Sequence, residues 1–387
     1  MRAQAVKLRA DAIVAASRHE DRRMDHNRRQ PRRARAVPAI TPRPTIKDIA
    51  ERCGVHPSTV SRALSPDMKH LVADDVARRI HAAANALGYR LNLAAAALRT
   101  GRSGLIGMLV PDIADPGFPP ILSGIADQLD AAGYATIVVD VGAHGSQQQF
   151  VDRLIGRGVD GLVLATVSLR DSIVKHCLDA GIPAVLVNRL DGRARLPSVA
   201  SDDAEGMRLA VNHLVELGHI SIAHVAGPPD ISTGARRRAG FEASAARAGL
   251  ATRDTMIEIA TAYTREAGRE AALRLLDRKA QPSAIVAAND LLALGVYDAL
   301  AARGLKCPDD VSVVGHNDMP YVDMLSPPLT TVRIAQRNMG EAAAKLLLSR
   351  IAGPSTKREH IVLAPELIVR RSTAAPREPS RRGMTIS

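Results

Sequence analysis

The chain has 387 residues, which is too long for one ordinary core and favours two or three domains. No apolar run approaches the roughly 18 residues of a membrane span, and the N-terminus lacks the apolar segment of a secretory signal. Cys53, Cys177 and Cys307 lie far apart without metal-binding spacing, so we expect reduced thiols in a cytoplasmic protein.

The net charge of +12 is concentrated towards the N-terminus. Residues 1–44 hold 12 Lys and Arg against 4 Asp and Glu, and residues 45–104 hold 9 against 5. Residues 105–387 then carry 31 of each sign. A basic front on a neutral body is expected of a protein that meets nucleic-acid phosphates with one end only.

Residues 1–44 are rich in arginine and interrupted by four prolines, which predicts a disordered extension. Two interpretations of it stay open. A basic arm could add nonspecific affinity for DNA. Alternatively, the natural start could lie downstream, for example at Met24.

Residues 45–62, TIKDIAERCGVHPSTVSR, predict two short helices joined by a tight turn. Thr45 and Asp48 have the spacing of a capping box at the start of the first helix. Gly54 suits the left-handed residue that ends this helix, and Pro57 suits the first turn of the next. The apolar stripe of the first helix consists of Ile46, Ile49, Ala50 and Cys53.

The second helix of this pair leaves Ser58, Ser61 and Arg62 on its outer side. A third helix over Val72–Leu87 would close a small core, with Gly88 at its end. A plain pair of packed helices needs only the apolar stripe. The tight turn and the polar outer face are typical of a helix-turn-helix domain, whose second helix enters the DNA major groove.

Several stretches of the chain, taken together and in order, resemble the LacI/GalR family of bacterial transcriptional regulators over about residues 45–374. The stretches are PSTVSR, ALGYRLNLAAAALRTGRSGLIGMLVPDI, VDGLVLA, HLVELGHISIAHVAG, RRRAGF, AANDLLALG and DVSVVGHNDMPYVDMLSPPLTTV. The resemblance implies an α/β protein with a helix-turn-helix headpiece at residues 45–90 and a hinge at 91–104. A bilobed effector-binding and dimerisation body of the periplasmic-binding-protein type I fold follows at 105–374, with a disordered tail at 375–387.

Within the hinge, Asn92–Arg99 corresponds to a helix that orders on operator DNA in the resembled family. There a leucine, Leu98 in this chain, enters the minor groove as a wedge that bends the duplex. Leu91 and Leu93 replace the prolines that are usual in the family. The residues expected to bind DNA are Thr45, Lys47, His56, Pro57, Ser58, Thr59, Ser61, Arg62, Asn92 and Leu98.

From Leu105 onward, short apolar runs alternate with amphipathic segments, which predicts parallel α/β sheets in two halves. A ligand cleft is then expected at the carboxyl ends of the strands, between the halves. The resemblance adds three crossovers between the lobes, one near Ser201–Asp203 and another near Thr330–Arg333. The predicted strands are Leu105–Val110, Ala135–Val139, Gly161–Leu164, Ala184–Val187, Ser221–Val225, Met256–Ile259, Ala284–Ala287 and Val311–Val314.

The resemblance also implies a set of effector-binding residues in the cleft. Arg238 is assigned to hydroxyl or carboxylate groups of the ligand, with a surface arginine as the alternative. Asn188 and Asn317 stand where the family often has acids, which favours a carboxylate-bearing or mixed ligand. Asp290 is assigned a structural role. The full set is Phe118, Asn188, Arg238, Tyr263, Asn289 and Asn317, of which Phe118 and Tyr263 could equally be wall residues that do not touch the ligand.

We therefore expect a transcriptional regulator that binds double-stranded operator DNA and a small-molecule effector as a homodimer, without cofactor or metal. A periplasmic solute-binding protein would need a signal peptide and no helix-turn-helix domain. An enzyme would need a nucleophile motif or a metal cluster, and neither GxSxG, a Walker loop nor HExxH is present. A constitutive nucleoid-type DNA binder would differ in showing no response to small molecules.

Overall fold

The computed structural model describes residues 44–65, 68–90, 101–142, 146–250, 256–279, 281–353 and 359–377. The chain divides into two compact units, residues 1–91 and residues 92–387, and each is treated by itself. The predicted basic extension up to residue 43 and the hinge residues Asn92 and Leu98 lie outside the described residues.

The first unit contains the predicted helices. Their bounds are α2 Ile46–Cys53, α3 Pro57–Ala63, the 3-10 helix η1 Lys69–Leu71 and α4 Asp74–Leu87. The carboxylate of Asp48 accepts hydrogen bonds from the backbone N–H and the hydroxyl of Thr45, at 2.6 and 2.9 Å. Gly54 ends α2 at φ 64°, where a residue with a Cβ would be strained. The third helix begins at Asp74 rather than Val72, because η1 occupies the turn before it.

A small apolar core holds these helices together. Ile49 and Cys53 of α2, Val60 of α3 and Ile80 of α4 are buried against one another. Arg79 fastens α4 to the end of α2, because its guanidinium donates to the backbone carbonyl of Cys53 at 2.6 Å. The apolar spacing of the sequence therefore decides which side of each helix faces inward, and the polar side of α3 is left outside.

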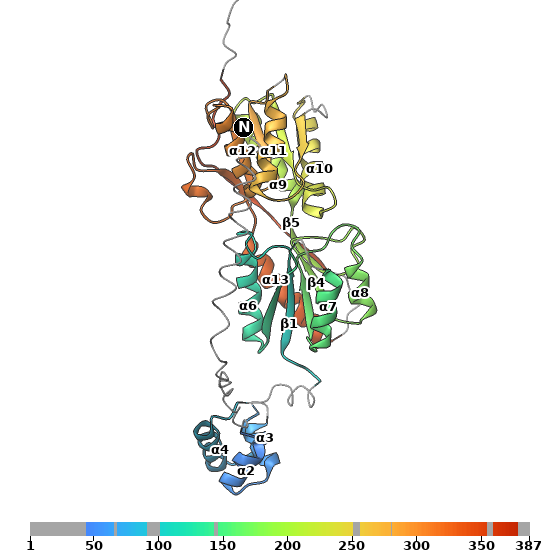
Figure 1. Ribbon diagram of the computed structural model, residues 1–387, viewed down its shortest axis with the longest axis vertical. Helices are drawn as coiled ribbons and strands as arrows, with labels where there is room; N and C mark the ends of the chain where they lie inside the picture. The colour runs from blue at the N-terminus through green and yellow to red at the C-terminus, as the bar shows by residue number, and fades with distance from the viewer. Residues whose placement is uncertain are drawn as a thin grey trace, which may run out of the picture. The chain divides into compact units, whose positions relative to one another are not determined.

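The second unit contains two six-stranded sheets with helices on both faces (Figure 1). Sheet A is parallel throughout, in the order β11-β5-β4-β3-β1-β2. Its strands are β1 Leu105–Val110, β2 Ala135–Asp140, β3 Gly161–Leu164, β4 Ala184–Val187, β5 Ser198–Ser201 and β11 His360–Leu363. Sheet B has the order β12-β10-β9-β8-β6-β7, and only β12 is antiparallel to its neighbour. Its strands are β6 Ile222–Ala226, β7 Ile257–Ile259, β8 Ala284–Ala287, β9 Ser312–Asn317, β10 Thr330–Arg333 and β12 Glu366–Ile368.

Each sheet and its helices form one lobe. Lobe 1 is sheet A with α6 Pro119–Ala131, α7 Gln147–Gly156, α8 Ile173–Asp179 and α13 Gln336–Ala352. Lobe 2 is sheet B with α9 Asp203–Glu216, α10 Ser232–Arg247, α11 Arg265–Leu276, α12 Asp290–Ala302 and the 3-10 helix η3 Val322–Met324. Strands β3, β4 and β8 are buried along their whole length, which explains why they appear in the sequence as continuous apolar runs.

The chain crosses between the lobes three times. It passes from β5 to α9 near residue 202, from β10 to α13 near residue 335, and from β11 to β12 near residue 365. The first two crossings lie where the resemblance placed them. Because the strands of each sheet end towards these crossings, the loops after the strands of both lobes face one cleft.

The C-terminal segment extends further than the sequence predicted. A disordered tail was expected from residue 375, but Arg377 forms an ion pair with Asp310. The backbone carbonyl of Ala374 accepts a hydrogen bond from His219 Nε2 at 2.8 Å. These contacts bind the segment to lobe 2 as far as residue 377, and residues 378–387 lie outside the described part. No helix in the described part of the chain is long and apolar enough to span a membrane.

Candidate functional site

The outer side of α3 presents a polar surface with one cation. His56, Ser58 and Arg62 are exposed, and Thr59 and Ser61 are half-buried beside them. The side chain of Arg62 is exposed and has no hydrogen bond or ion pair with any described residue, so its planar guanidinium is available for a ligand. Lys47 is exposed near the start of α2. This surface can donate hydrogen bonds to base edges and phosphates.

His56 also has a structural role that the sequence did not reveal. Its Nδ1 accepts from the backbone N–H of Ser58 at 3.2 Å and lies 2.8 Å from the Ser58 hydroxyl, so His56 caps the N-terminus of α3. Because Nδ1 is the acceptor, the neutral ring carries its proton on Nε2. His56 therefore caps α3 through Nδ1, and its Nε2–H is an exposed donor beside the polar side of this helix.

In the second unit, a narrow cavity lies between the lobes at the carboxyl ends of the strands. Polar side chains dominate its wall, with three apolar residues among them. The lining residues are Asp115, Gly117, Phe118, Ile121, Asn188, Arg189, Thr233, Arg237, Tyr263, Asn289, Asn317, Ile334 and Gln336. Five of the six residues predicted to bind the effector are therefore brought together here, and the exception is Arg238.

Lobe 1 supplies one wall of the cavity, with the loops after β1 and β4. Asp115 lies in the first loop, where its carboxylate accepts from the backbone N–H of Gly117 at 2.8 Å. Burial raises the pKa of Asp115, and the nearby guanidinium of Arg189 opposes this shift. Phe118 is buried at the start of α6. Asn188 follows β4 at φ 65°, a conformation that asparagine tolerates better than most residues.

Lobe 2 supplies the facing wall. The Asn289 side chain caps α12 by accepting from the backbone N–H of Leu292 at 2.9 Å, so its amide group is held at the strand end. The Tyr263 hydroxyl lies 3.1 Å from the Thr233 hydroxyl. Its ring fits because residue 227 is glycine: a Cβ on Gly227 would lie 2.3 Å from the Tyr263 oxygen. Burial raises the pKa of Tyr263, which keeps its hydroxyl protonated.

On lobe 2 the arginine that lines the cavity is Arg237, and the placement of Arg238 in the cleft was wrong. Arg237 is 2% exposed and donates from Nε to Asp203 Oδ1 at 2.8 Å and from Nη1 to the Ala288 carbonyl at 2.6 Å. Arg238 points away and pairs with Glu242 one turn later at 2.8 Å. Consecutive helix residues lie about 100° apart, so one step in register moves a side chain off the buried face. The spacing to Phe241, four residues after Arg237 and buried, is the signal that indicates the correct arginine.

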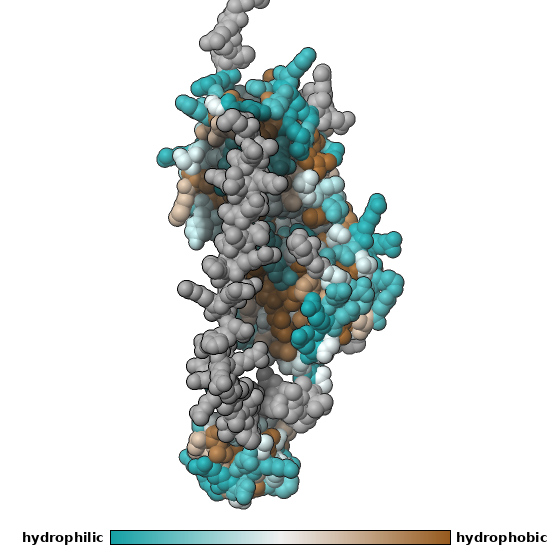
Figure 2. Space-filling model, viewed as in Figure 1, coloured by the Kyte–Doolittle hydropathy of each residue, from teal (hydrophilic) through white to brown (hydrophobic). Residues whose placement is uncertain are grey.

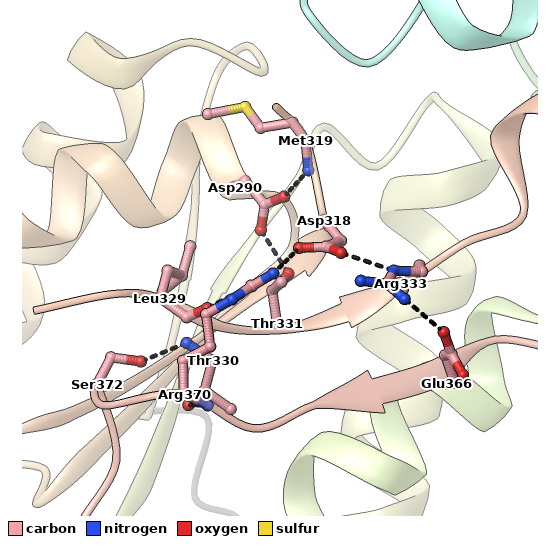
Figure 3. A network of polar contacts seen from close by, with 10 residues as sticks. All are labelled: Asp290, Asp318, Met319, Leu329, Thr330, Thr331, Arg333, Glu366, Arg370 and Ser372. Atoms are coloured by element: carbon pink, nitrogen blue, oxygen red, sulfur yellow. Dashed lines mark hydrogen bonds and ion pairs between the residues drawn. The ribbon is translucent and has the colours of Figure 1, made fainter. Parts of the chain in front are cut away.

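The position of Asn317 depends on a network of ion pairs (Figure 3). Asn317 and Asp318 have φ angles of 112° and 52°, which strain the backbone where β9 ends. The Asp318 carboxylate accepts from Arg333 at 2.7 Å and from Arg370 at 2.8 Å, and Arg333 also binds Glu366 at 2.9 Å. Because Arg333 and Glu366 adjoin two crossings between the lobes, the network ties a cavity residue to the interlobe segments.

Asp290 supports the same loop. Its two oxygens accept from the backbone N–H of Met319 at 2.8 Å and from the Thr331 hydroxyl at 2.6 Å (Figure 3). Burial raises the pKa of Asp290 to about 7. The residue does not line the cavity, which agrees with the structural role assigned from the sequence.

Besides Arg237, four polar lining residues were missed by the sequence analysis: Asp115, Arg189, Thr233 and Gln336. Asp115 and Arg189 follow strands β1 and β4, so the rule that finds residues at strand ends could have found them. Gln336 lies just after a crossing, and its buried Nε2 has no hydrogen-bond partner within the described residues. No group of three or more His, Cys, Asp and Glu within the same residues is placed to hold a metal ion.

Known proteins share both units. A family model of bacterial regulatory proteins, lacI family, matches residues 45–92, and a periplasmic binding protein-like domain model matches residues 211–373. The HTH-type transcriptional regulator MalR of Streptomyces coelicolor is 35% identical over 347 residues, which cover 87% of this chain and 98% of MalR. The chain belongs to the LacI family.

As a member of the LacI family, it is a transcriptional regulator with a helix-turn-helix domain and a periplasmic-binding-protein-like body. The lac repressor dimer bound to operator and the anti-inducer ONPF is a similar structure, with a TM-score of 0.77 and 28% identity over 86% of this chain and 99% of the repressor. The complex of the transcriptional regulator CelR with cellobiose has a TM-score of 0.66 and 30% identity over 85% of this chain and all of that one.

Proposed function

We propose that this LacI-family protein is a repressor that binds operator DNA through α3 and changes its operator affinity when a small polar molecule binds between the lobes. The observation that carries the proposal is the pairing of two sites in one chain. One is the polar outer side of α3, with its uncommitted Arg62. The other is the cavity at the strand ends, where five of the six effector residues expected from the sequence converge.

For the DNA contact, we propose separate tasks for the side chains of the first unit. Ser58 and Arg62 lie one helical turn apart on α3 and can both reach base edges, with Arg62 suited to the two acceptors of a guanine. His56, Pro57, Thr59 and Ser61 then set the distance of α3 from the groove. Thr45 and Lys47, at the start of α2, suit the phosphates. Asn92 and Leu98 remain the proposed minor-groove residues of the hinge.

For the effector, the charges of the cavity favour an uncharged polyhydroxylated molecule such as a sugar. Arg237 is paired with Asp203, and Arg189 lies near Asp115, so the formal charges cancel. This pairing removes the argument for a carboxylate ligand, which rested on an arginine opposite neutral residues. The amide groups that line the wall can donate to and accept from hydroxyls, and the Phe118 ring offers an apolar face to a sugar ring.

For the assembly, we propose a homodimer that uses the free edge of sheet A. Strand β2 ends this sheet, and its residues are exposed or half-buried along the whole strand. Val138 on this strand is 38% exposed. Figure 2 shows apolar residues gathered on the visible face of lobe 1, which supports a partner surface on this lobe. A dimer would also place two copies of α3 on two half-sites.

The proposal is tested in two steps on the full chain. Operator sequences are first selected from random DNA, and compounds that raise the thermal unfolding temperature are found in a screen of neutral sugars, sugar acids and organic acids. Operator affinity is then measured with and without each stabilising compound. We expect neutral sugars among the stabilising compounds and a change in operator affinity with them. Selection of no consensus sequence would refute the DNA assignment, and stabilisation by organic acids alone would refute the proposed effector chemistry.

A further inference from the structure

A second cavity, of about 230 Å³, lies beside strands β4, β5 and β11 of sheet A and shares no residue with the effector cavity. Alternate residues of these strands point to opposite faces of the sheet. Val185 and Val199 pack against the α13 side, whereas Leu186, Ser198 and Ala200 line the second cavity. Strand β11, the loop after β4 and the exposed Arg236 of α10 complete its wall.

Most of this wall is aliphatic. Leu186, Leu190, Leu196 and Ala200 line it, and Val362 of β11 is 56% exposed beside them. An apolar ligand that covers this surface removes it from water, which stabilises the complex by roughly 25 cal/mol for each Å² buried. The wall therefore favours a ligand with an aliphatic portion.

The polar residues of the wall differ in whether they already have close hydrogen-bond or ion-pair partners. The Asp191 carboxylate is fully buried and pairs with Arg195 at 2.9 Å, and Ser198 lies 2.9 Å from His360 Nδ1. Arg236 is different. Its side chain is 44% exposed, and its nearest carboxylate is Asp203, 3.7 Å away.

The Asp203 carboxylate already pairs with Arg237, the residue that follows Arg236 on α10. It accepts a hydrogen bond from Arg237 at 2.8 Å, so its pairing with Arg236 is long and secondary. The guanidinium of Arg236 thus keeps N–H groups free at the rim of an aliphatic cavity, and an anionic oxygen there can accept hydrogen bonds from them.

We propose that this cavity is a second small-molecule site, for an amphipathic anion whose aliphatic body lies against Leu186, Leu190 and Val362. Its carboxylate or phosphate group is bound by Arg236. The chemistry of the site is independent of the effector in the cleft, so the proposal stands even if the function proposed above fails.

The site is tested by isothermal titration of the full chain with three probes of equal chain length, octanoate, octyl phosphate and 1-octanol, below their aggregation limits. We expect at least one anion to bind roughly tenfold or more tightly than octanol, because the ionic hydrogen bond to Arg236 is absent for the alcohol. The two anions compare a carboxylate with a phosphate head group.

Three variants locate the binding. Arg236→Gln lowers the affinity for the anion by roughly tenfold and leaves octanol unchanged. Arg238→Gln, on the outer side of the same helix, is the matched control and keeps the parental affinity. Val362→Asp places a carboxylate on the exposed aliphatic wall and abolishes binding of the anion, with an unchanged unfolding temperature as the check on folding.

The proposal is overturned if neither anion binds more tightly than octanol, or if Arg236→Gln binds the anion as the parent does. A loss of affinity in Gln336→Ala without a loss in Arg236→Gln would place the probe in the effector cavity instead.

Discussion

Arg237 and Arg238 are neighbours of the same residue type, yet the structure gives them very different energetic roles. Arg237 is buried and compensates the buried carboxylate of Asp203, whereas Arg238 forms an exposed i,i+4 pair with Glu242. Removing one partner of a buried pair leaves an uncompensated charge, so Arg237→Ala should lower the free energy of unfolding by about 3–5 kcal/mol. Arg238→Ala should lower it by about 0.5 kcal/mol or less.

The assay is calorimetric unfolding of the full chain. In a body of this size each kcal/mol moves the unfolding temperature by roughly 2–4 °C, so Arg237→Ala should unfold roughly 10 °C below the parent. Arg238→Ala should stay within roughly 2 °C. Adding Asp203→Ala to Arg237→Ala should recover part of the loss, because the unpaired carboxylate is then gone. Equal losses in the two single variants, or no recovery in the double variant, would refute this interpretation of the pair.

Three further predictions concern DNA binding and pH. Arg62→Ala should cost about 1–3 kcal/mol at one base position of the selected operator and relax the preference there, and a uniform loss over all sequences would assign Arg62 to phosphates instead. Lys47→Ala should reduce the slope of log affinity against log salt by about one, and an unchanged slope would exclude a phosphate contact. Burial lowers the pKa of His224 to about 4 from an ordinary value of 6.5. The neutral ring is favoured in the folded state, so its contribution to stability is complete above pH 6.5 and is lost as the pH falls towards 4. His224→Leu should therefore reduce the loss of stability between these pH values in chemical denaturation, and an unchanged pH dependence would contradict the assigned pKa.

Much of the fold follows from local patterns that can be recognised in the sequence. The buried strands β3, β4 and β8 are unbroken apolar runs, and their bounds match the prediction. In the first unit, Thr45 and Asp48 cap the start of α2, and the left-handed Gly54 ends it. Their capping hydrogen bonds reach only residues within four positions along the chain. Such features are predictable because their energetics depend on neighbours in the chain rather than on distant contacts.

The cleft was harder to predict because it depends on side-chain direction and on distant partners. The choice between Arg237 and Arg238 depends on Asp203, more than 30 residues earlier, which no local pattern connects to α10. Asp318, which follows Asn317 in the strained segment, is held by Arg333 and Arg370, which come from later segments. The tail was predicted to start too early for the same reason, since Arg377 gains its partner, Asp310, only from lobe 2.

The central claim is that a molecule bound between the lobes controls DNA binding by the first unit. Its most direct test is the affinity of the full chain for its selected operator, measured by fluorescence anisotropy with and without a saturating sugar that stabilises the body. We predict a change in operator affinity of about 5- to 150-fold, and the reciprocal change in sugar affinity when operator is present. The double variant Asp115→Asn, Gln336→Ala should need a roughly tenfold higher sugar concentration for the same change. An operator affinity that stays constant while the sugar is bound would contradict the claim.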